Sequence, residues 1–140
     1  TIVENIYKKM AEKNGTFFCS VYQTDERYKQ KYKNMRINES IDYKDVAAIV
    51  QESNCIIDIV IGKQTGLSLR AYEALAYNKK LLTNNKSILS FPQYDERYMR
   101  YFETIEDIDW QFVLQRDTVD YGYKGEYSPV GFLKKVCEFL

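Results

Sequence analysis

The sequence predicts an α/β fold: a three-layer, Rossmann-like sandwich with a mostly parallel sheet that lacks its first strand. Amphipathic helical segments alternate with short apolar runs, which is the pattern of a parallel sheet covered by helices. The chain has 140 residues, so we expect a single domain over residues 1–140. A helical segment comes first, where such domains usually open with a strand, and this order predicts that the first strand is missing.

The first third of the chain predicts two helices and two strands. Apolar side chains recur at helical spacing over residues 1–14, and Asn14-Gly15 is a typical signal for a helix end. The aromatic and β-branched run 16–22 predicts a buried strand. The segment 24–33 is crowded with charges and predicts a solvated loop or a marginal helix, and 35–37 predicts a short strand.

The middle of the chain predicts two further units of helix and strand. Asp42 offers an N-cap for a helix over Tyr43 to Glu52, whose apolar residues form one stripe. The apolar run 55–61 predicts a buried strand. A Gly-bearing loop, a helix from Leu69 to Tyr77 and a strand over 80–84 follow.

The last third predicts shorter and more irregular elements. We expect a turn over 87–94, a short strand from Tyr98 to Phe102, a helix or turn over 106–114, and a polar, irregular stretch over 117–127. Ser128-Pro129 is a typical helix start. The helix that follows is apolar on one face, and we expect it to pack on the sheet.

Composition excludes several classes of function. Twenty basic and twenty acidic residues cancel, so we expect no nucleic-acid partner. The absence of His excludes Ser–His and Cys–His nucleophiles and the commonest transition-metal ligand, so we expect no metal and no cofactor. Cys19, Cys55 and Cys137 lie far apart in apolar stretches, which predicts buried free thiols and a cytoplasmic protein. No apolar run approaches the roughly 20 residues that span a bilayer.

The loop before the helix at Leu69 is the first place to look for a ligand. A strand that feeds a helix through a short loop leaves backbone N–H groups at the carboxyl edge of a parallel sheet, and such groups attract phosphates. Gly66 and Ser68 could supply amides and a hydroxyl to a diphosphate. The spacing of Gly62 and Gly66 matches neither the phosphate-loop pattern nor the dinucleotide pattern, and an ordinary loop turn is the alternative.

Two charged residues of that helix are candidates for the same ligand. Glu73 lies near the helix start, where a carboxylate can accept two hydrogen bonds from ribose hydroxyls, and Arg70 is a forked donor for phosphate. The alternative is a solvated ion pair on the helix surface. The apolar residues Leu69, Leu75 and Ala76 predict the buried face of the helix.

Polar residues in and beside the apolar strands leave alternatives open. Asp58 lies inside an apolar run, where it either contacts a neighbouring helix start or marks the solvated end of the strand. Lys79 and Lys80 precede the next strand and are interpreted as solvated turn residues.

Residues 66–85 resemble the donor-binding region in the C-terminal half of GT-B glycosyltransferases. They read Gly-Leu-Ser-Leu-Arg-Ala-Tyr-Glu-Ala-Leu-Ala-Tyr-Asn-Lys-Lys-Leu-Leu-Thr-Asn-Asn. The shared pattern is a glycine-containing loop, a helix with Glu-Ala-Leu/Met-Ala, a turn, and a strand ending near Thr-Asn, and residues 43–61 fit as the preceding helix and strand. The likeness is strongest to bacterial proteins of lipopolysaccharide or capsule synthesis.

The resemblance implies a role for individual residues. Glu73 matches the glutamate that holds the donor ribose, and Gly66 to Ser68 match the loop whose amides meet the diphosphate. Arg70 or Lys63 would stabilise the diphosphate leaving group, which needs no metal in this fold class. Thr65 stands where many retaining members carry a second glutamate, and no catalytic residue is assigned. The expected donor-nucleotide site is therefore Lys63, Thr65, Gly66, Leu67, Ser68, Arg70 and Glu73.

The resemblance also implies partners. The ligand would be a nucleotide-diphosphate sugar, and transfer would need an N-terminal acceptor-binding domain that is absent here, so we expect the isolated chain to be inactive. Membrane association would come only through that missing part. Two alternatives stay open: a non-catalytic α/β interaction module, and a nucleotide-sensing or response-regulator-like domain, for which Asp58 alone does not supply the acidic cluster.

Overall fold

The computed structural model describes residues 1–21, 24–62 and 65–138. Over these residues it is a mixed α/β fold with a two-stranded and a three-stranded sheet, both all-parallel, which confirms the predicted Rossmann-like class lacking a first strand. The chain divides into two compact units, Thr1–Glu52 and Ser53–Leu140, and each is described by itself. The expectation of a single domain stays a prediction.

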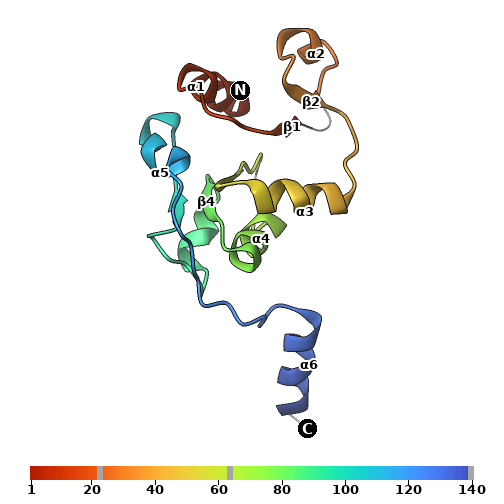
Figure 1. Cartoon of the computed structure of the whole chain (residues 1–140), viewed down its shortest axis with the longest axis vertical. Helices are drawn as coiled ribbons and strands as arrows, with labels where there is room; N and C mark the ends of the chain where they lie inside the picture. The colour runs from red at the N-terminus through yellow and green to blue at the C-terminus, as the bar shows by residue number, and fades with distance from the viewer. Residues whose placement is uncertain (22–23, 63–64, 139–140) are drawn as a thin grey trace. The chain divides into compact units, whose positions relative to one another are not determined.

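The first unit is a short parallel strand pair with three helices (Figure 1). Its elements are α1 (Ile2–Glu12), β1 (Cys19–Val21), α2 (Tyr28–Lys31), β2 (Met35–Ile37) and α3 (Tyr43–Glu52). β1 and β2 pair with Cys19 opposite Met35. A core of Tyr32, Met35 and Ile37 packs against partly buried apolar side chains of α1, which carries its apolar residues on one face.

Most predicted elements of this unit are confirmed. The helix over 43–52 has the predicted bounds, and the first helix is followed by Asn14 in the left-handed conformation (φ 54°) that the Asn-Gly signal indicates. The strand expected over 16–22 is shorter, since β1 spans only three residues, and the ring of Phe18 is 44% exposed rather than buried. Residue 22 lies outside the described residues.

The second unit holds the three-stranded sheet and the candidate site. Its elements are β3 (Cys55–Asp58), α4 (Leu69–Tyr77), β4 (Lys80–Thr83), the 3-10 helix η1 (Lys86–Ser90), β5 (Met99–Tyr101), the 3-10 helix η2 (Ile105–Asp107), α5 (Trp110–Leu114) and α6 (Pro129–Glu138). The strand order is β3-β4-β5, with Asp58 opposite Thr83 and Leu81 opposite Met99. All four residues of the central strand β4 are buried, and α4 lies against β3 and β4.

The C-terminal helix differs from the prediction in its packing. α6 forms where Ser128-Pro129 predicts it, but Val130 and Leu133 are 62% and 60% exposed, and Val136 is also exposed. The expected packing of its apolar face on the sheet is therefore wrong for these side chains. Residues 139–140 lie outside the described part of the chain.

The cysteines also differ from the prediction. All three are free thiols, as expected, but Cys19 and Cys55 are only partly buried and Cys137 is exposed. Burial raises the pKa of Cys55 to about 12, so this thiol stays protonated at neutral pH. None of the helices in the described ranges is both long enough and apolar enough to pass through a bilayer.

Candidate functional site

The candidate site lies where β3 and β4 end and α4 begins. Because β3 and β4 are parallel, their carboxyl ends meet at one edge of the sheet, and the register places Asp58 opposite Thr83. α4 starts at Leu69, after Ser68 as its N-cap residue. Side chains from both strand ends and from the helix start therefore gather at this edge.

Asp58 contacts the start of α4, which decides between the two alternatives that the sequence left open. The Ser68 hydroxyl donates a hydrogen bond to Asp58 Oδ2 at 2.7 Å, and the Thr83 hydroxyl donates to the same oxygen at 3.4 Å. An N-cap serine usually accepts a hydrogen bond from an amide in the first turn of its helix. The Ser68 side chain makes no such bond, and in the first turn the Ala71 amide donates instead to the Ser68 carbonyl at 3.2 Å.

Glu73 is a buried carboxylate on the second turn of α4. It is 4% exposed, and Arg70 Nη1 donates a hydrogen bond to Glu73 Oε2. Burial raises the pKa of Glu73, the charge of Asp58 acts in the same direction, and Arg70 opposes both. The alternative of a solvated surface pair is therefore wrong, because the carboxylate is buried and the Arg70 side chain is only 34% exposed.

The buried face of α4 agrees with the sequence prediction at Leu75 but not at Leu69 and Ala76. Ala71, Ala74 and Leu75 are buried, as Glu73 is, whereas Leu69 is 57% exposed and Ala76 is exposed. Ala71, Ala74 and Leu75 lie three and four residues apart and form the buried stripe, whereas Leu69 and Ala76 lie off this stripe, on the side of the helix that carries Glu73. A buried carboxylate on that side of the helix is unusual and indicates a specific partner.

The loop before α4 contains two glycines with left-handed backbone. Gly62 and Gly66 have φ of 83° and 87°, and a Cβ added at either would meet no other atom within 4 Å. Glycine is therefore required by the backbone conformation and not by lack of space. Lys63 lies outside the described residues, so the structure tests nothing about it. Thr65 is exposed and Leu67 is half-buried.

The structure thus brings together only some of the predicted site residues. Ser68 is linked to Asp58, and Arg70 is paired with Glu73. Gly66 is held through its carbonyl oxygen by Asn85. In the ranges that the structure describes, no group of three or more His, Cys, Asp or Glu side chains is placed to hold a metal ion.

Sequence reasoning missed the tripeptide Thr83-Asn84-Asn85 at the end of β4. The Asn84 side chain donates to the Val60 carbonyl at 3.0 Å and accepts from the Val60 amide at 2.7 Å. Asn85 Nδ2 donates to the Gly66 carbonyl at 2.7 Å, and Asn85 is 6% exposed. The signal was available, because the last residue of a buried parallel strand and the two residues after it are all polar, and they lie at the edge of the sheet from which α4 begins.

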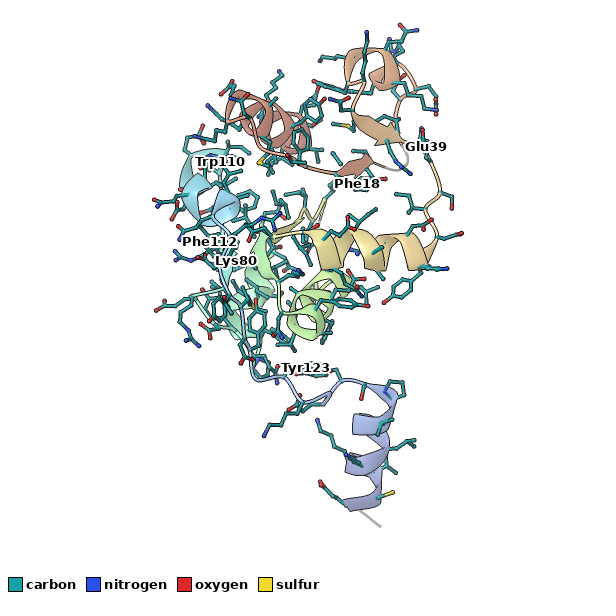
Figure 2. All side chains as sticks on the ribbon, viewed as in Figure 1. Phe18, Glu39, Lys80, Trp110, Phe112 and Tyr123 are labelled. Atoms are coloured by element: carbon teal, nitrogen blue, oxygen red, sulfur yellow. The ribbon has the colours of Figure 1, made fainter. Side chains whose placement is uncertain are left out.

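Lys80 is the clearest correction to the sequence analysis. It is fully buried rather than solvated, and its ammonium donates to the carbonyls of Phe112 and Gln115 and to Asp117 at 3.2 Å. Its nitrogen lies 5.0 Å from the centre of the Phe112 ring, and Figure 2 shows these two side chains next to one another. Lys80 is thus a structural residue that joins the first position of β4 to the end of α5.

In chemical terms, the edge offers acceptors for hydroxyl groups and donors for an anion. Glu73 and Asp58 supply carboxylate oxygens, Arg70 supplies guanidinium donors, and the first turn of α4 supplies amides. Comparison of the chain with protein-family models, with curated proteins and with solved structures found no match.

Proposed function

We propose that this chain binds the nucleotide of a nucleotide-diphosphate sugar, as the donor-binding part of a bacterial glycosyltransferase for lipopolysaccharide or surface polysaccharide. The observation that carries the proposal is the burial of the Glu73 carboxylate on the second turn of α4, the helix that begins at the carboxyl edge of a parallel sheet. It is supported by the resemblance of residues 66–85 to the donor-binding region of GT-B glycosyltransferases, in which a glutamate at this position holds the ribose.

In the proposed complex, Glu73 accepts hydrogen bonds from the two ribose hydroxyls. In the structure, Arg70 donates a hydrogen bond to Glu73 Oε2. When the nucleotide binds, the guanidinium turns from this carboxylate to the diphosphate. The exchange keeps both charged groups paired, since Glu73 gains two hydroxyl donors and Arg70 gains phosphate oxygens. Loop amides and, by the resemblance, Lys63 complete the phosphate contacts.

Transfer itself is assigned to the protein as a whole and not to this chain. In the proposed enzyme an acceptor-binding domain faces the donor domain, and any association with a membrane belongs to that other domain. The diphosphate leaving group is stabilised by amides and Arg70, with no metal or organic cofactor in the scheme. We assign the activity to the cytoplasm, where nucleotide sugars are made.

A second candidate is a non-catalytic α/β interaction or nucleotide-sensing module. Thr65 favours it, because this exposed threonine stands where many retaining glycosyltransferases carry a glutamate. Such a module would use the same fold to bind a nucleotide or a protein partner without transferring a sugar.

Nucleotide titration tests the proposal. The ¹⁵N-labelled chain is titrated with UDP, GDP, ADP and CMP, and amide shifts are followed in the wild type, in Glu73→Gln and in the control Glu96→Gln, which removes an exposed carboxylate. We expect one nucleotide to bind saturably, with the largest shifts in residues 66–73, and Glu73→Gln to weaken binding at least tenfold while Glu96→Gln has no effect. Absence of saturable binding by every nucleotide at millimolar concentration would overturn the proposal.

A further inference from the structure

Three consecutive side chains, the last of β4 and the two that follow it, bond to the end of β3 and to two points of the segment that leads from β3 to α4. Thr83 bonds Asp58 and accepts a hydrogen bond from the Asn85 amide at 3.0 Å, Asn84 bonds Val60, and Asn85 bonds Gly66. The residues at the end of β4 therefore contact both ends of the loop between β3 and α4. None of these three residues belongs to the site that the sequence predicts.

Asn84 continues the pairing of β3 beyond its last residue. Its amide group accepts from the Val60 N–H and donates to the Val60 C=O, as the backbone of a neighbouring strand would do. The strand was predicted to run to residue 61 and ends at Asp58, and this pair of hydrogen bonds keeps the next two residues in place. The role of Asn84 is thus to hold the end of the strand.

Asn85 acts on the other end of the loop, and its own orientation is fixed. Its Oδ1 accepts from the Ser87 amide at 3.0 Å, which caps the start of η1, while its Nδ2 donates to the Gly66 carbonyl. Both the oxygen and the nitrogen of this side-chain amide make hydrogen bonds, and only 6% of the residue is exposed. The Nδ2 donor is therefore fixed in one orientation. The Gly66 carbonyl therefore points to Asn85.

The direction of that carbonyl decides the direction of the next amide. Among the described peptide bonds none is cis, and in a trans peptide the C=O and N–H point in opposite directions. The Leu67 N–H thus points away from Asn85. Gly66 itself has a φ of 87°, a backbone conformation that a side chain would disfavour.

We propose that Asn85 is a positioning residue for the donor diphosphate: by holding the Gly66 carbonyl, it aims the Leu67 amide at the phosphate oxygens. The inference rests on the proposed function and adds to it the residue that sets the orientation of the phosphate loop before the ligand arrives. An amide that is already aimed loses less freedom on binding, so affinity for the diphosphate depends on the Asn85 donor.

Two variants with side chains of the same shape separate the effect of positioning the Gly66–Leu67 peptide from the effect of an added negative charge. Asn85→Asp keeps the acceptor for the Ser87 amide and replaces only the donor to Gly66 by an oxygen, which repels that carbonyl. Asn84→Asp adds the same charge one residue away, keeps the acceptor for the Val60 amide, and leaves the Gly66 peptide untouched. Asn85→Ala serves as a third, uncharged variant, and all are compared in 150 mM NaCl, where surface charges are screened.

The probes are inorganic pyrophosphate and the nucleotides of the titration above, followed by ¹⁵N–¹H spectra. We expect Asn85→Asp and Asn85→Ala to weaken pyrophosphate binding about fivefold or more, the worth of one hydrogen bond, and Asn84→Asp by less than about twofold. The spectroscopic signature is the ¹⁵N shift of Leu67 without ligand, which reports the hydrogen bond on the preceding carbonyl. We expect the Leu67 ¹⁵N shift to change in both Asn85 variants and to remain unchanged in Asn84→Asp.

The outcomes distinguish this inference from the proposed function. If a nucleotide binds and Glu73→Gln weakens it, but the Asn85 variants bind like the wild type or no worse than Asn84→Asp, the inference is wrong and the function stands. If pyrophosphate shifts the Leu67 amide in an Asn85-dependent way but no nucleotide binds, the function is wrong and the positioning role stands. An unmoved Leu67 ¹⁵N shift in both Asn85 variants also overturns the inference.

Discussion

At the scale of single residues, Lys80 and Glu73 are the charged side chains that are buried within the described part of the chain, and each is buried for a different reason. Lys80 is bonded to carbonyl oxygens at the end of α5, where a cation is favoured, so its burial serves the fold. Glu73 is paired with Arg70, whose side chain is partly exposed to solvent. The sequence shows both residues in apolar surroundings but does not show which one has its hydrogen bonds satisfied by backbone.

Replacing Lys80 tests the structural role. Lys80→Met keeps the length of the side chain but leaves the carbonyls of Phe112 and Gln115 buried without their donor, and we expect the free energy of unfolding to fall by about 3 kcal/mol. The measurement is urea unfolding followed by circular dichroism. Lys86→Met, at an exposed position, is the control and should change stability little. Equal effects of the two variants would contradict the role of Lys80.

Glu73 gives stability a dependence on pH. Its pKa is raised above the ordinary value of 4.5, so between these two values the folded chain binds more protons than the unfolded chain. The contribution of this group to stability is therefore fully present below pH 4.5 and is lost as the pH rises through the raised pKa. We expect unfolding free energies measured from about pH 4 to pH 8 to fall more steeply in the wild type than in Glu73→Gln. Parallel curves would show that the raised pKa has no effect.

At the scale of elements, periodicity and end signals predicted the helices well, because apolar spacing and caps are local. The bounds of α3 and the left-handed residue after α1 were both readable from sequence. Strand lengths were not readable from the sequence, because a strand ends where its partner strand ends. β3 ends at Asp58, and the residues that follow it are bonded to the Asn84 side chain. The site was predicted along the chain, from loop to helix, and the part contributed by the next strand was missed.

The tetrapeptide Asp-Glu-Arg-Tyr occurs twice and folds in the same way each time. In both copies the aspartate accepts from the backbone amide and the guanidinium of the arginine two residues on, at Asp25 with Arg27 and at Asp95 with Arg97. The first copy leads into α2 and the second leads into β5. The motif is therefore a local turn that is independent of the element that follows.

In the second copy of this turn, the hydrogen bond to the backbone amide and the ion pair can be tested separately by substitution. Asp95→Ala removes the acceptor of a backbone amide and should destabilise the fold by about 1 kcal/mol, whereas Arg97→Ala removes an exposed ion pair and should cost less than about 0.5 kcal/mol. Arg97 also lowers the pKa of Asp95, so this stabilisation is present above pH 3.8 and is lost as the pH falls through the lowered pKa. Chemical unfolding of both variants and the double variant measures these effects, and a larger loss in Arg97→Ala would contradict the assignment.

At the scale of the whole molecule, the two compact units differ in how much apolar surface they bury. The core of the first unit is built around two three-residue strands, whereas the second has a central strand whose four residues are all buried. The fold class was predictable because the strands in the described ranges are short, mostly apolar, and separated by helices or long connections. The division into two units was not, since no change in composition marks residue 52.

This difference predicts unequal resistance to opening. Amides of β4, such as those of Leu81 and Leu82, should exchange with solvent at least tenfold more slowly than those of Arg36 and Ile37 in β2. The reason is that β4 is flanked by a strand on each side and completely buried, whereas β2 has a single partner. Native-state hydrogen exchange measured by NMR gives both rates in one experiment, and similar rates would mean that the two units open together.

In the loop between β3 and α4, the residues that are hydrogen-bonded to the end of β4 differ from the residues that are most exposed to solvent. Asn84 and Asn85 bond Val60 and Gly66, which anchors the loop at these two points. Ile61 is 81% exposed and Thr65 is exposed, and neither contributes to the anchoring contacts. Under the proposed function, substitutions at these two exposed positions change the groups offered to the ligand and leave the anchoring hydrogen bonds in place.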